Sequence, residues 1–444
     1  MLTFCADVLY IKYKLGGGYM LSAFRIKNFK SILDLDVKLN FSEGKAPNGY
    51  KELDTVLFLE PKKEHRYVPC LAMYGANASG KTNIIKAINT LKYIIFNGIE
   101  QQYAPNKLNT KFNSSLFELS FFIKNKEYHY VMEYNKDEIL TERLKENKNI
   151  IFNISPKDKD FENIATKGYT EQRLKEIFNV ECCNTARQQK FTFLNKIATN
   201  YAGLNKIISN VFSHIKEEIE IYPINQFPLS FGMDKLAAAQ DYQSINASFE
   251  KITSLLRKLD IDIDRMTFER NIKKIADLTK PIETPTMPDH WTIKDDVLSM
   301  DYIYSYHKDT EGKEVKFNFK DESEGTQIIA GLLGIFLSAL ERGTTLIIDE
   351  LERSLHPLLF IEILRLFKDK RYNKNNAQII FTVHNTDILD GDLLRVSEIG
   401  IVRKVLKEGT TLRQVSDFDG IRNALNFRKQ YLNGAFSGIP HPYI

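Results

Sequence analysis

The segment from Gly75 to Thr82 reads GANASGKT, and it constrains the fold more than any other part of the chain. It matches the phosphate-binding pattern G-x-x-x-x-G-K-[ST] at every fixed position. Such a loop joins a buried strand to a helix whose N-terminus faces the phosphates. The apolar run Val68 to Tyr74 predicts that strand, and apolar residues at helical spacing after Lys81 predict that helix. We therefore expect a nucleotide site on an α/β core.

Each fixed residue of this loop has a chemical reason to be there. Gly75 and Gly80 let the backbone wrap tightly, so that several N–H groups point inward at phosphate oxygens. Lys81 brings positive charge to the β- and γ-phosphates, and the Thr82 hydroxyl is a ligand for Mg²⁺. The predicted nucleotide-binding set of the loop is Gly75, Asn77, Ser79, Gly80, Lys81, Thr82 and Asn83.

Two acidic residues follow a second apolar run. The run from Thr345 to Ile348 predicts a buried parallel strand, and Asp349 and Glu350 come directly after it. Ligands of α/β folds bind at the carboxyl ends of parallel strands. Asp349 is thus placed to hold the Mg²⁺ shell, and Glu350 to orient the attacking water or take its proton. The alternative is a strand that ends in acids at a surface turn, and the upstream phosphate loop favours the catalytic interpretation.

A third strand of the same kind is predicted from Gln378 to Val383, and it ends at His384. A histidine there can hydrogen-bond the γ-phosphate and report its presence. An isolated histidine at a strand end is more often structural. Here a predicted helix from about Pro357 to Lys368 separates the two strands, as a βαβ unit requires, and this favours the sensor role.

The hexapeptide from Glu322 to Gln327, ESEGTQ, precedes a long predicted helix that runs to about Leu340. Ser323 is suited to cap that helix, and Gly325 allows another backbone to come close. An exposed helix N-terminus with a hydroxyl and free N–H groups is an anion site. Read alone, the hexapeptide predicts an ordinary helix cap.

In this order, the four motifs resemble those of the stand-alone ABC ATPases of the RloA/AbiL type, which are related to OLD, RecF and SMC head domains. The matching segments are Tyr74 to Asn83, Glu322 to Thr326, Asp349 to Pro357, Thr382 to Asn385, the tail Tyr431 to Pro440 and the opening Phe24 to Ser31. The resemblance implies that ATP and Mg²⁺ join two heads, with Ser323 and Gly325 of one copy facing the nucleotide on Lys81 of the other. Hydrolysis at Glu350 would then release the two copies.

The chain departs from related patterns at two places. The signature has Glu324 where transporter-type signatures have glycine, which is usual for this branch. The stretch from Leu394 to Ile399 lacks the Arg-Arg-Asp often found there, so a role for that loop is open. The glutamine of the usual Q-loop also has no clear position, and Gln101 and Gln102 are two candidates.

The fold class expected from these motifs is α/β, with a P-loop parallel sheet core, an antiparallel β lobe and an inserted helical lobe. Residues 1–19 are expected to be a non-native or disordered extension, with Met20 as the natural start. We expect residues 20–169 and 291–444 to form the two parts of the ATPase head, and residues 170–290 to form the inserted helical lobe and linker. In the first part, alternation from Leu116 to Tyr134 predicts a hairpin that turns at Asn125 and Lys126.

Composition excludes few functions. The net charge of +4 is nearly balanced and neither requires nor excludes nucleic acid. The basic segment Arg265 to Lys274 could touch DNA or an acidic partner, and a solvated helix face is favoured. The four cysteines lack C-x-x-C spacing, which argues against a zinc hook and fits a reducing cytoplasm. The apolar run Ile328 to Leu340 is too short for a membrane span and fits a buried helix, so no membrane partner is expected.

Members of the family that the chain resembles often act in defence against phage and signal to a separate toxic partner, commonly a nuclease. We expect a cytoplasmic, homodimeric or larger ATPase that serves as sensor or regulator of an abortive-infection system. Fewer residues follow His384 than the TOPRIM domain of OLD-type nucleases needs, so the effector is expected on another protein. The alternatives are a DNA-clamping ATPase in repair or maintenance and a scaffold that hardly hydrolyses ATP, against which the intact Glu350 argues.

Overall fold

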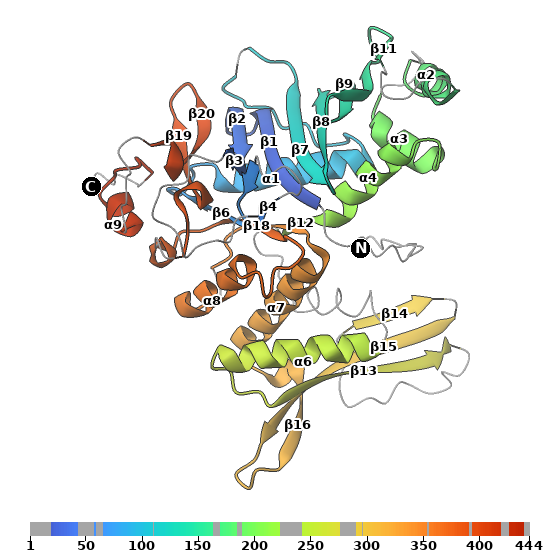
Figure 1. Cartoon of the computed structure of the whole chain (residues 1–444). Helices are drawn as coiled ribbons and strands as arrows, with labels where there is room; N and C mark the ends of the chain where they lie inside the picture. Colours follow the sequence, from blue (N-terminus) through green and yellow to red (C-terminus); the bar gives the residue numbers. More distant parts are fainter. Residues whose placement is uncertain are drawn as a thin grey trace.

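One large mixed sheet organises the molecule (Figure 1). The computed structural model describes residues 19–42, 57–58, 65–109, 111–162, 169–183, 189–222, 242–275, 290–294, 296–352, 355–389, 393–418 and 426–438. Within these residues the sheet has 13 strands, in the order β11-β10-β9-β8-β7-β1-β2-β20-β19-β6-β18-β17-β12. Of the extension expected at residues 1–19, only Tyr19 is described, and it is the first residue of β1.

The nucleotide half of this sheet is parallel. Its strands are β19 (Ile399–Val405), β6 (Cys70–Tyr74), β18 (Gln378–Thr382), β17 (Thr345–Ile348) and β12 (Ile219–Tyr222). The three central strands consist wholly of buried residues, as expected for a parallel sheet covered on both faces. Because these strands run in one direction, their carboxyl ends meet at one edge of the sheet.

Helices cover both faces of the parallel strands. Helix α1 (Lys81–Asn97) shares a buried cluster with Ile347 and Ile380 on one face. Helices α7 (Glu324–Arg342) and α8 (Pro357–Lys368) share another with Leu346 and Phe381 on the opposite face (Figure 1). The alternation of these strand side chains between the two clusters follows from the period of two along a strand.

The other half of the sheet is antiparallel. It contains β1 (Tyr19–Phe29), β2 (Ile32–Lys38), β7 (Ser115–Ile123), β8 (Lys126–Tyr134), β9 (Ile139–Glu146), β10 (Asn149–Ser155), β11 (Asp160–Glu162) and β20 (Gly409–Gln414). The predicted hairpin is confirmed as β7–β8, with Ile123 opposite Lys126. Its turn therefore lies at Lys124 and Asn125, one residue earlier than predicted, and Lys124 has a φ of 56°.

Three further helices and a three-stranded sheet border the antiparallel half. The helices are α2 (Tyr169–Glu181), α3 (Phe193–Asn200) and α4 (Lys206–Glu218). The three-stranded sheet consists of β3 (Asn40–Ser42), β5 (His65–Tyr67) and β4 (Leu57–Phe58). The start of α3 is anchored by the buried Glu142, whose carboxylate accepts the backbone N–H groups of Phe193 at 2.5 Å and Leu194 at 3.0 Å. This contact attaches the helix to strand β9.

A second unit, here called the small-sheet lobe, projects below the main sheet (Figure 1). It consists of α6 (Tyr242–Lys258), β13 (Arg265–Lys274), β14 (His290–Lys294), β15 (Val297–Lys308) and β16 (Glu314–Asn318). The strands β13, β14 and β16 all pair with β15 in antiparallel fashion. One side of the sheet packs on α6, with Met266, Phe268 and Ile303 in the same buried cluster as α7.

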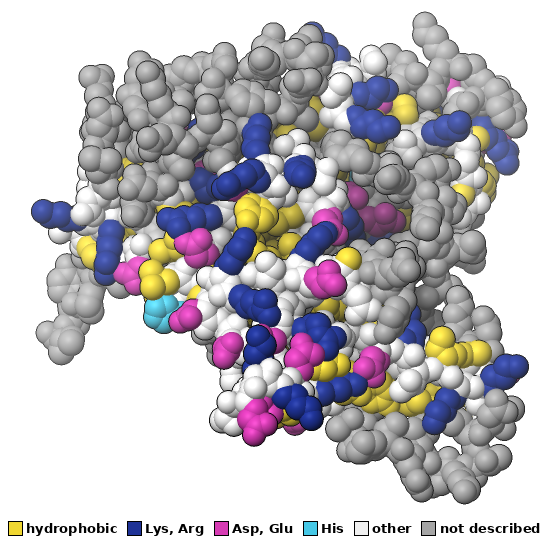
Figure 2. Space-filling view, turned by 60° about the horizontal axis from the view of Figure 1, so that its bottom comes forward, with side chains coloured by type: hydrophobic (Ala, Val, Ile, Leu, Met, Phe, Trp, Pro, Cys, Tyr) yellow, Lys and Arg dark blue, Asp and Glu magenta, His cyan; other side chains and the backbone are white. Residues whose placement is uncertain are grey.

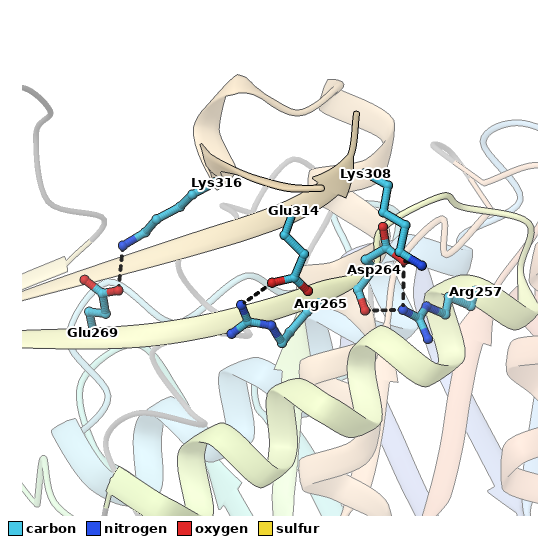
Figure 3. Close-up of polar contacts among 7 residues, drawn as sticks. All are labelled: Arg257, Asp264, Arg265, Glu269, Lys308, Glu314 and Lys316. Carbon is cyan, nitrogen blue, oxygen red and sulfur yellow. Dashed lines mark hydrogen bonds and ion pairs between the residues drawn. The ribbon is translucent and has the colours of Figure 1, made fainter. Parts of the chain in front are cut away.

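The helix favoured for Arg265 to Lys274 is wrong, because this segment is strand β13. It pairs with β15 along its whole length, and its buried Met266 and Phe268 alternate with more exposed neighbours. Two surface charges of the strand are paired across the sheet, Arg265 with Glu314 at 2.9 Å and Glu269 with Lys316 at 2.6 Å (Figure 3). Long-range strand pairing thus outweighed a local pattern that resembled a helix.

The stretch 170–290 contains α3, α4 and α6 together with most of α2, and it also contributes strands to both sheets. Strand β12 is the edge strand of the main sheet beside β17, and β13 pairs with β15 beyond residue 290. The domain boundaries given above remain a prediction.

Helix α7 is, within the described part of the chain, the one helix long and apolar enough to cross a membrane by length and composition. It lies in the core, with Leu333 and Phe336 fully buried against the parallel sheet and α8. Its apolar character therefore has a packing reason.

The chain after β18 continues into β19 and β20 of the main sheet. It forms the short 3₁₀ helices η3 (Thr386–Ile388), η4 (Val396–Glu398) and η5 (Val415–Asp417), and helix α9 (Phe427–Leu432). The loop whose role was left open contains η4, where the Arg395 N–H donates to the buried Glu398, which also pairs with the buried Lys368 of α8. In this structure the loop anchors α8.

Candidate nucleotide site

The phosphate loop lies between β6 and α1, as predicted. Strand β6 ends at Tyr74 and the helix begins at Lys81, so the loop occupies the edge where the parallel strands end. The Lys81 ammonium bends back over the loop and donates to the carbonyl oxygens of Gly75 at 2.7 Å and Ala76 at 3.3 Å. The helix N-terminus and this ammonium together place positive charge at the loop, as phosphate binding requires.

Packing by itself requires both fixed glycines. A Cβ at Gly75 would lie 2.2 Å from the carbonyl oxygen of Val402, on the neighbouring strand β19. A Cβ at Gly80, whose φ is 108°, would lie 2.1 Å from the Thr410 hydroxyl of β20. The loop is thus held close against the sheet, with no room for a side chain at either position.

A chain of hydrogen bonds supports the loop from the antiparallel half of the sheet. The Asn83 amide donates to the Ser31 hydroxyl at 2.8 Å, and that hydroxyl lies 2.7 Å from the Thr410 hydroxyl. Thr410 donates in turn to the carbonyl oxygen of Ser79 at 3.0 Å. Asn83, predicted as a nucleotide ligand, is therefore placed in the support of the loop. No sequence pattern pointed to Thr410.

The residues of the predicted loop set differ in their exposure to solvent. Asn77 is exposed, Thr82 and Asn83 are half-buried, and Ser79 is buried. Ala78 has a φ of 61°, so the tip of the loop adopts the left-handed conformation that turns backbone N–H groups to one side. The nucleotide-binding roles of these side chains remain predictions.

The predicted acid pair lies at the end of β17, next to Thr382 of β18. Asp349 is 2% exposed, and its Oδ1 accepts a hydrogen bond from the Thr382 hydroxyl at 2.6 Å. The same hydroxyl accepts the backbone N–H of Glu350 at 2.7 Å, and Glu350 has a φ of 50°. One threonine hydroxyl thus orients both acids. Sequence reasoning missed Thr382 because its role depends on the pairing of two strands.

The second oxygen of Asp349 fits a place in a Mg²⁺ shell. This Oδ2 is buried and has no hydrogen-bond partner among the described residues. A buried carboxylate oxygen without a partner is costly, and a cation would remove that cost. The described residues contain no group of three His, Cys, Asp or Glu that could hold a metal. Mg²⁺ takes one or two protein ligands beside water and phosphate oxygens.

Glu352 is a third carboxylate at this edge, and sequence reasoning did not single it out. Its Oε1 accepts the backbone N–H of His384 at 2.5 Å, while its Oε2 is buried without a described partner. The His384 side chain itself is exposed at the end of the strand, and its sensor role remains a prediction. The sequence could have indicated this residue, because it is a glutamate two positions after the Asp-Glu pair.

The electrostatics of the site fit an anionic ligand. Burial lowers the pKa of Lys81, and the carboxylates of Asp349, Glu352 and Glu350 oppose that shift, in this order of size. Burial, with Glu352 adding to it, raises the pKa of Tyr74 well above its usual value. A phosphate group close to Lys81 would favour the charged ammonium again.

The signature segment lies apart from these groups, at the N-terminus of α7. Ser323 caps the helix, since its hydroxyl accepts the N–H of Thr326 at 3.1 Å and lies 2.8 Å from the Thr326 hydroxyl. Both Ser323 and Gly325 are exposed, and among the described residues a Cβ at Gly325 would meet only the Ser323 hydroxyl, at 3.9 Å. The cap is confirmed, and the space around it is open to another molecule.

The candidates for the Q-loop glutamine lie after α1. Gln101 is exposed with a φ of 58°, and the carbonyl oxygen of Gln102 accepts the Tyr134 hydroxyl at 3.1 Å. These observations do not decide which glutamine would belong to the Q-loop.

The fold and this site define an ATPase head of the ABC type, with a P-loop parallel core fused to an antiparallel half-sheet. Residues 70–390 match a family model described as "AAA domain, putative AbiEii toxin, Type IV TA system". The match covers more than half of the chain, so the chain belongs to this family. The expected resemblance to stand-alone ABC ATPases is confirmed at this level.

Solved structures of SMC head domains are also similar. The head from Thermotoga maritima is 14% identical, with 89% of this chain and 98% of that chain covered and a TM-score of 0.41. The head with an extended coiled coil from Pyrococcus furiosus, bound to the C-terminal domain of ScpA, is 11% identical, with 94% and 100% covered and a TM-score of 0.43. The head from Pyrococcus yayanosii is 10% identical, with 94% and 100% covered and a TM-score of 0.44. The comparison with curated proteins found no match.

Proposed function

We propose that this chain hydrolyses ATP with Mg²⁺ at sites shared between two copies, and that it acts as the sensor or regulator of a bacterial abortive-infection system. In this proposal a separate effector, such as a nuclease, carries out the toxic step. The compartment that fits is the cytoplasm. The single observation that carries the shared site is the exposed, capped N-terminus of α7, which has open space at Gly325.

The residues of this chain divide the chemistry of hydrolysis. Lys81 and the N-terminus of α1 bind the phosphates, and Thr82 and Asp349 would hold Mg²⁺, which supplies charge neutralisation at the β- and γ-phosphates. Glu350 orients the attacking water and takes its proton, from a position set by Thr382. Ser323 and the free N–H groups of α7 would meet the γ-phosphate on the second copy.

A mixing experiment tests the shared site. Lys81→Ala removes nucleotide binding but leaves Ser323 intact. Ser323→Arg blocks the contact from the second copy but leaves Lys81 intact. Each variant alone is expected to be inactive. Mixed in equal amounts, they form dimers with one intact site, and ATP hydrolysis should recover to about a quarter of the parent rate. If the mixture stays as inactive as its components, the shared site is wrong.

The regulatory role is supported by the family description, which names a toxin–antitoxin system. It is tested by expressing the tagged chain with its genomic neighbours and determining the mass and composition of the purified complex. A stable complex with a nuclease or toxin is expected. A bare dimer would count against the sensor–effector role.

The DNA-clamping alternative receives little support from the described surface. Figure 2 shows Lys and Arg side chains interspersed with Asp and Glu over the face that it presents. On the small-sheet lobe, Arg265 and Lys316 are engaged by Glu314 and Glu269. Nucleic-acid sites concentrate unopposed positive charge. DNA that stimulates ATP hydrolysis by the isolated chain would nevertheless decide for the clamp.

A further inference from the structure

Only a short piece of chain joins the small-sheet lobe to Ser323. Strand β16 ends at Asn318, the 3₁₀ helix η2 covers Phe319–Asp321, and Glu322 directly precedes Ser323. The Asn318 side chain caps η2, and the Phe319 side chain is buried in the core beneath α7. Because this connection is short and anchored, a displacement of β16 is passed on to Ser323.

The Glu322 side chain makes a second connection to the lobe. Its Oε1 accepts the Ser305 hydroxyl at 2.5 Å and lies 2.6 Å from Nε2 of His307, and both partners are on β15. The ring of Phe317, on β16, packs edge-on against the His307 ring with centroids 5.3 Å apart. The position of Glu322 is therefore set by two strands of the lobe together.

Glu322 also holds the first turn of α7 from its other side. Its carbonyl oxygen accepts a hydrogen bond from the Gln327 side chain at 2.6 Å. Further along the helix, α6 of the lobe is linked to α7 by the ion pair of Lys251 and Glu341 at 2.6 Å. The lobe and α7 thus share contacts at both ends of the helix.

These contacts add little to the free energy of unfolding, and their main effect is on the position of the signature segment. The side chains of His307 and Glu322 are 30% and 14% exposed. Partly exposed ion pairs contribute at most modestly to the free energy of unfolding. Among the described polar contacts of the lobe, the ion pair of Glu269 and Lys316 joins strand to strand, whereas the hydrogen bond between His307 and Glu322 reaches the signature segment. A reacting group displaced by about 1 Å can lose most of its effect.

We propose that Glu322, held by Ser305 and His307, is a positioning residue that sets where the first turn of α7 meets the nucleotide of the second copy. The small-sheet lobe then regulates the assembly of the shared site, because a partner that moves β15 also moves Ser323. This inference rests on the proposed function, since it needs a nucleotide held by a second copy.

The test measures ATP-dependent dimerisation of the full chain. Glu350→Gln is used as the parent, because it removes the base but keeps the phosphate contacts and so traps the ATP-bound dimer. In Mg-ATP, adding Glu322→Ala should raise the dimer dissociation constant roughly tenfold in sedimentation experiments. ATP binding by the dilute monomer should stay within about twofold, because the loop at Lys81 is untouched.

Glu269→Ala is the matched control. It removes a glutamate that contacts the same sheet at the same distance, 2.6 Å, but it does not touch the signature segment. It should leave the dimer dissociation constant unchanged. A Glu322→Ala dimer as tight as the Glu269→Ala dimer would overturn the positioning role.

A pair of His307 variants gives an answer even if Glu322→Ala does not fold. His307→Gln keeps an N–H donor for Glu322, and His307→Leu removes it. We expect the glutamine variant to dimerise nearly like the parent and the leucine variant to weaken the dimer. Equal effects of both variants would overturn the inference.

The failure of this inference can be told apart from the failure of the proposed function. Ser323→Arg acts on the shared site directly. If Ser323→Arg leaves the ATP-bound dimer intact, the shared site itself is wrong. If Ser323→Arg abolishes the dimer while Glu322→Ala does not weaken it, only the positioning role is wrong.

Discussion

The phosphate loop and the small-sheet lobe are held in place by different means. The loop is fixed by a partly buried chain of hydroxyls and amides and by glycines without room for a Cβ. The lobe shares a buried apolar cluster with α7, and its strands are joined at the surface by ion pairs such as Lys316 with Glu269, where each side chain is 41% exposed. Buried polar contacts are costly to break, and exposed ion pairs are not. This difference suits a rigid nucleotide site beside a lobe that can shift.

The largest effect is expected at Gly75. Gly75→Ala would place a Cβ 2.2 Å from a carbonyl oxygen of β19, so the loop or the strand must move. We expect loss of measurable ATP binding in calorimetry and a loss of about 3 kcal/mol in the free energy of unfolding in urea. Gly325→Ala is the control, because the space there is open, and ATP binding by its monomer should not change. Normal ATP binding by Gly75→Ala would show that the loop can move to accept a Cβ and is not rigid.

The next effect is expected at Thr382. Thr382→Val removes the hydroxyl that orients Asp349 and Glu350, so kcat should fall about a hundredfold while ATP still binds. The matched control is Thr345→Val, which removes a buried hydroxyl bonded to Gln378 at 3.1 Å, away from the acids. Steady-state kinetics of both variants check this. Equal losses would mean that Thr382 acts through stability alone.

A pH effect is expected in the antiparallel half of the sheet. Burial raises the pKa of Glu142 to about 7, against opposing hydrogen bonds from Leu194 and Phe193, and burial also raises that of Glu218 to about 7. The pKa of each glutamate is higher in the folded than in the unfolded protein. The contribution of the two glutamates to the free energy of unfolding is therefore complete below about pH 4.5 and is lost as the pH rises through about 7.

For Glu142, the free energy of unfolding should fall by on the order of 2 kcal/mol between pH 5 and pH 8. Urea unfolding at several pH values measures this slope, and Glu142→Gln should flatten it in part, with Glu218 responsible for a further share. A slope unchanged by Glu142→Gln would assign the pH dependence elsewhere.

The smallest effect is expected on the lobe. Glu269→Ala should lower the free energy of unfolding by less than about 1 kcal/mol, and less at high salt, because the pair with Lys316 is exposed. Thermal melting at low and high salt checks this. A loss comparable to that of Gly75→Ala would remove the distinction between a rigid site and a lobe that can shift.

Local pattern was enough for the elements of the nucleotide core. The helix predicted from Pro357 to Lys368 has those bounds in the structure, and the strand predicted from Thr345 ends at Ile348, directly before the acids. Ser323 caps α7 as expected. Each of these segments contains its own pattern within a few residues, such as fixed glycines, a cap or an unbroken apolar run. They could therefore be predicted without knowing which distant residues pack against them.

The sequence by itself therefore determined the class of site, the order of its motifs and the residues of the phosphate loop and acid pair. Only the tertiary structure decided that Thr410 and Ser31 support the loop, that Thr382 orients the acids, and that the segment from Arg265 to Lys274 is a strand. Each of these depends on strand neighbours far away in the chain. Such contacts are selected by burial and by hydrogen bonding between strands, which a local pattern does not encode.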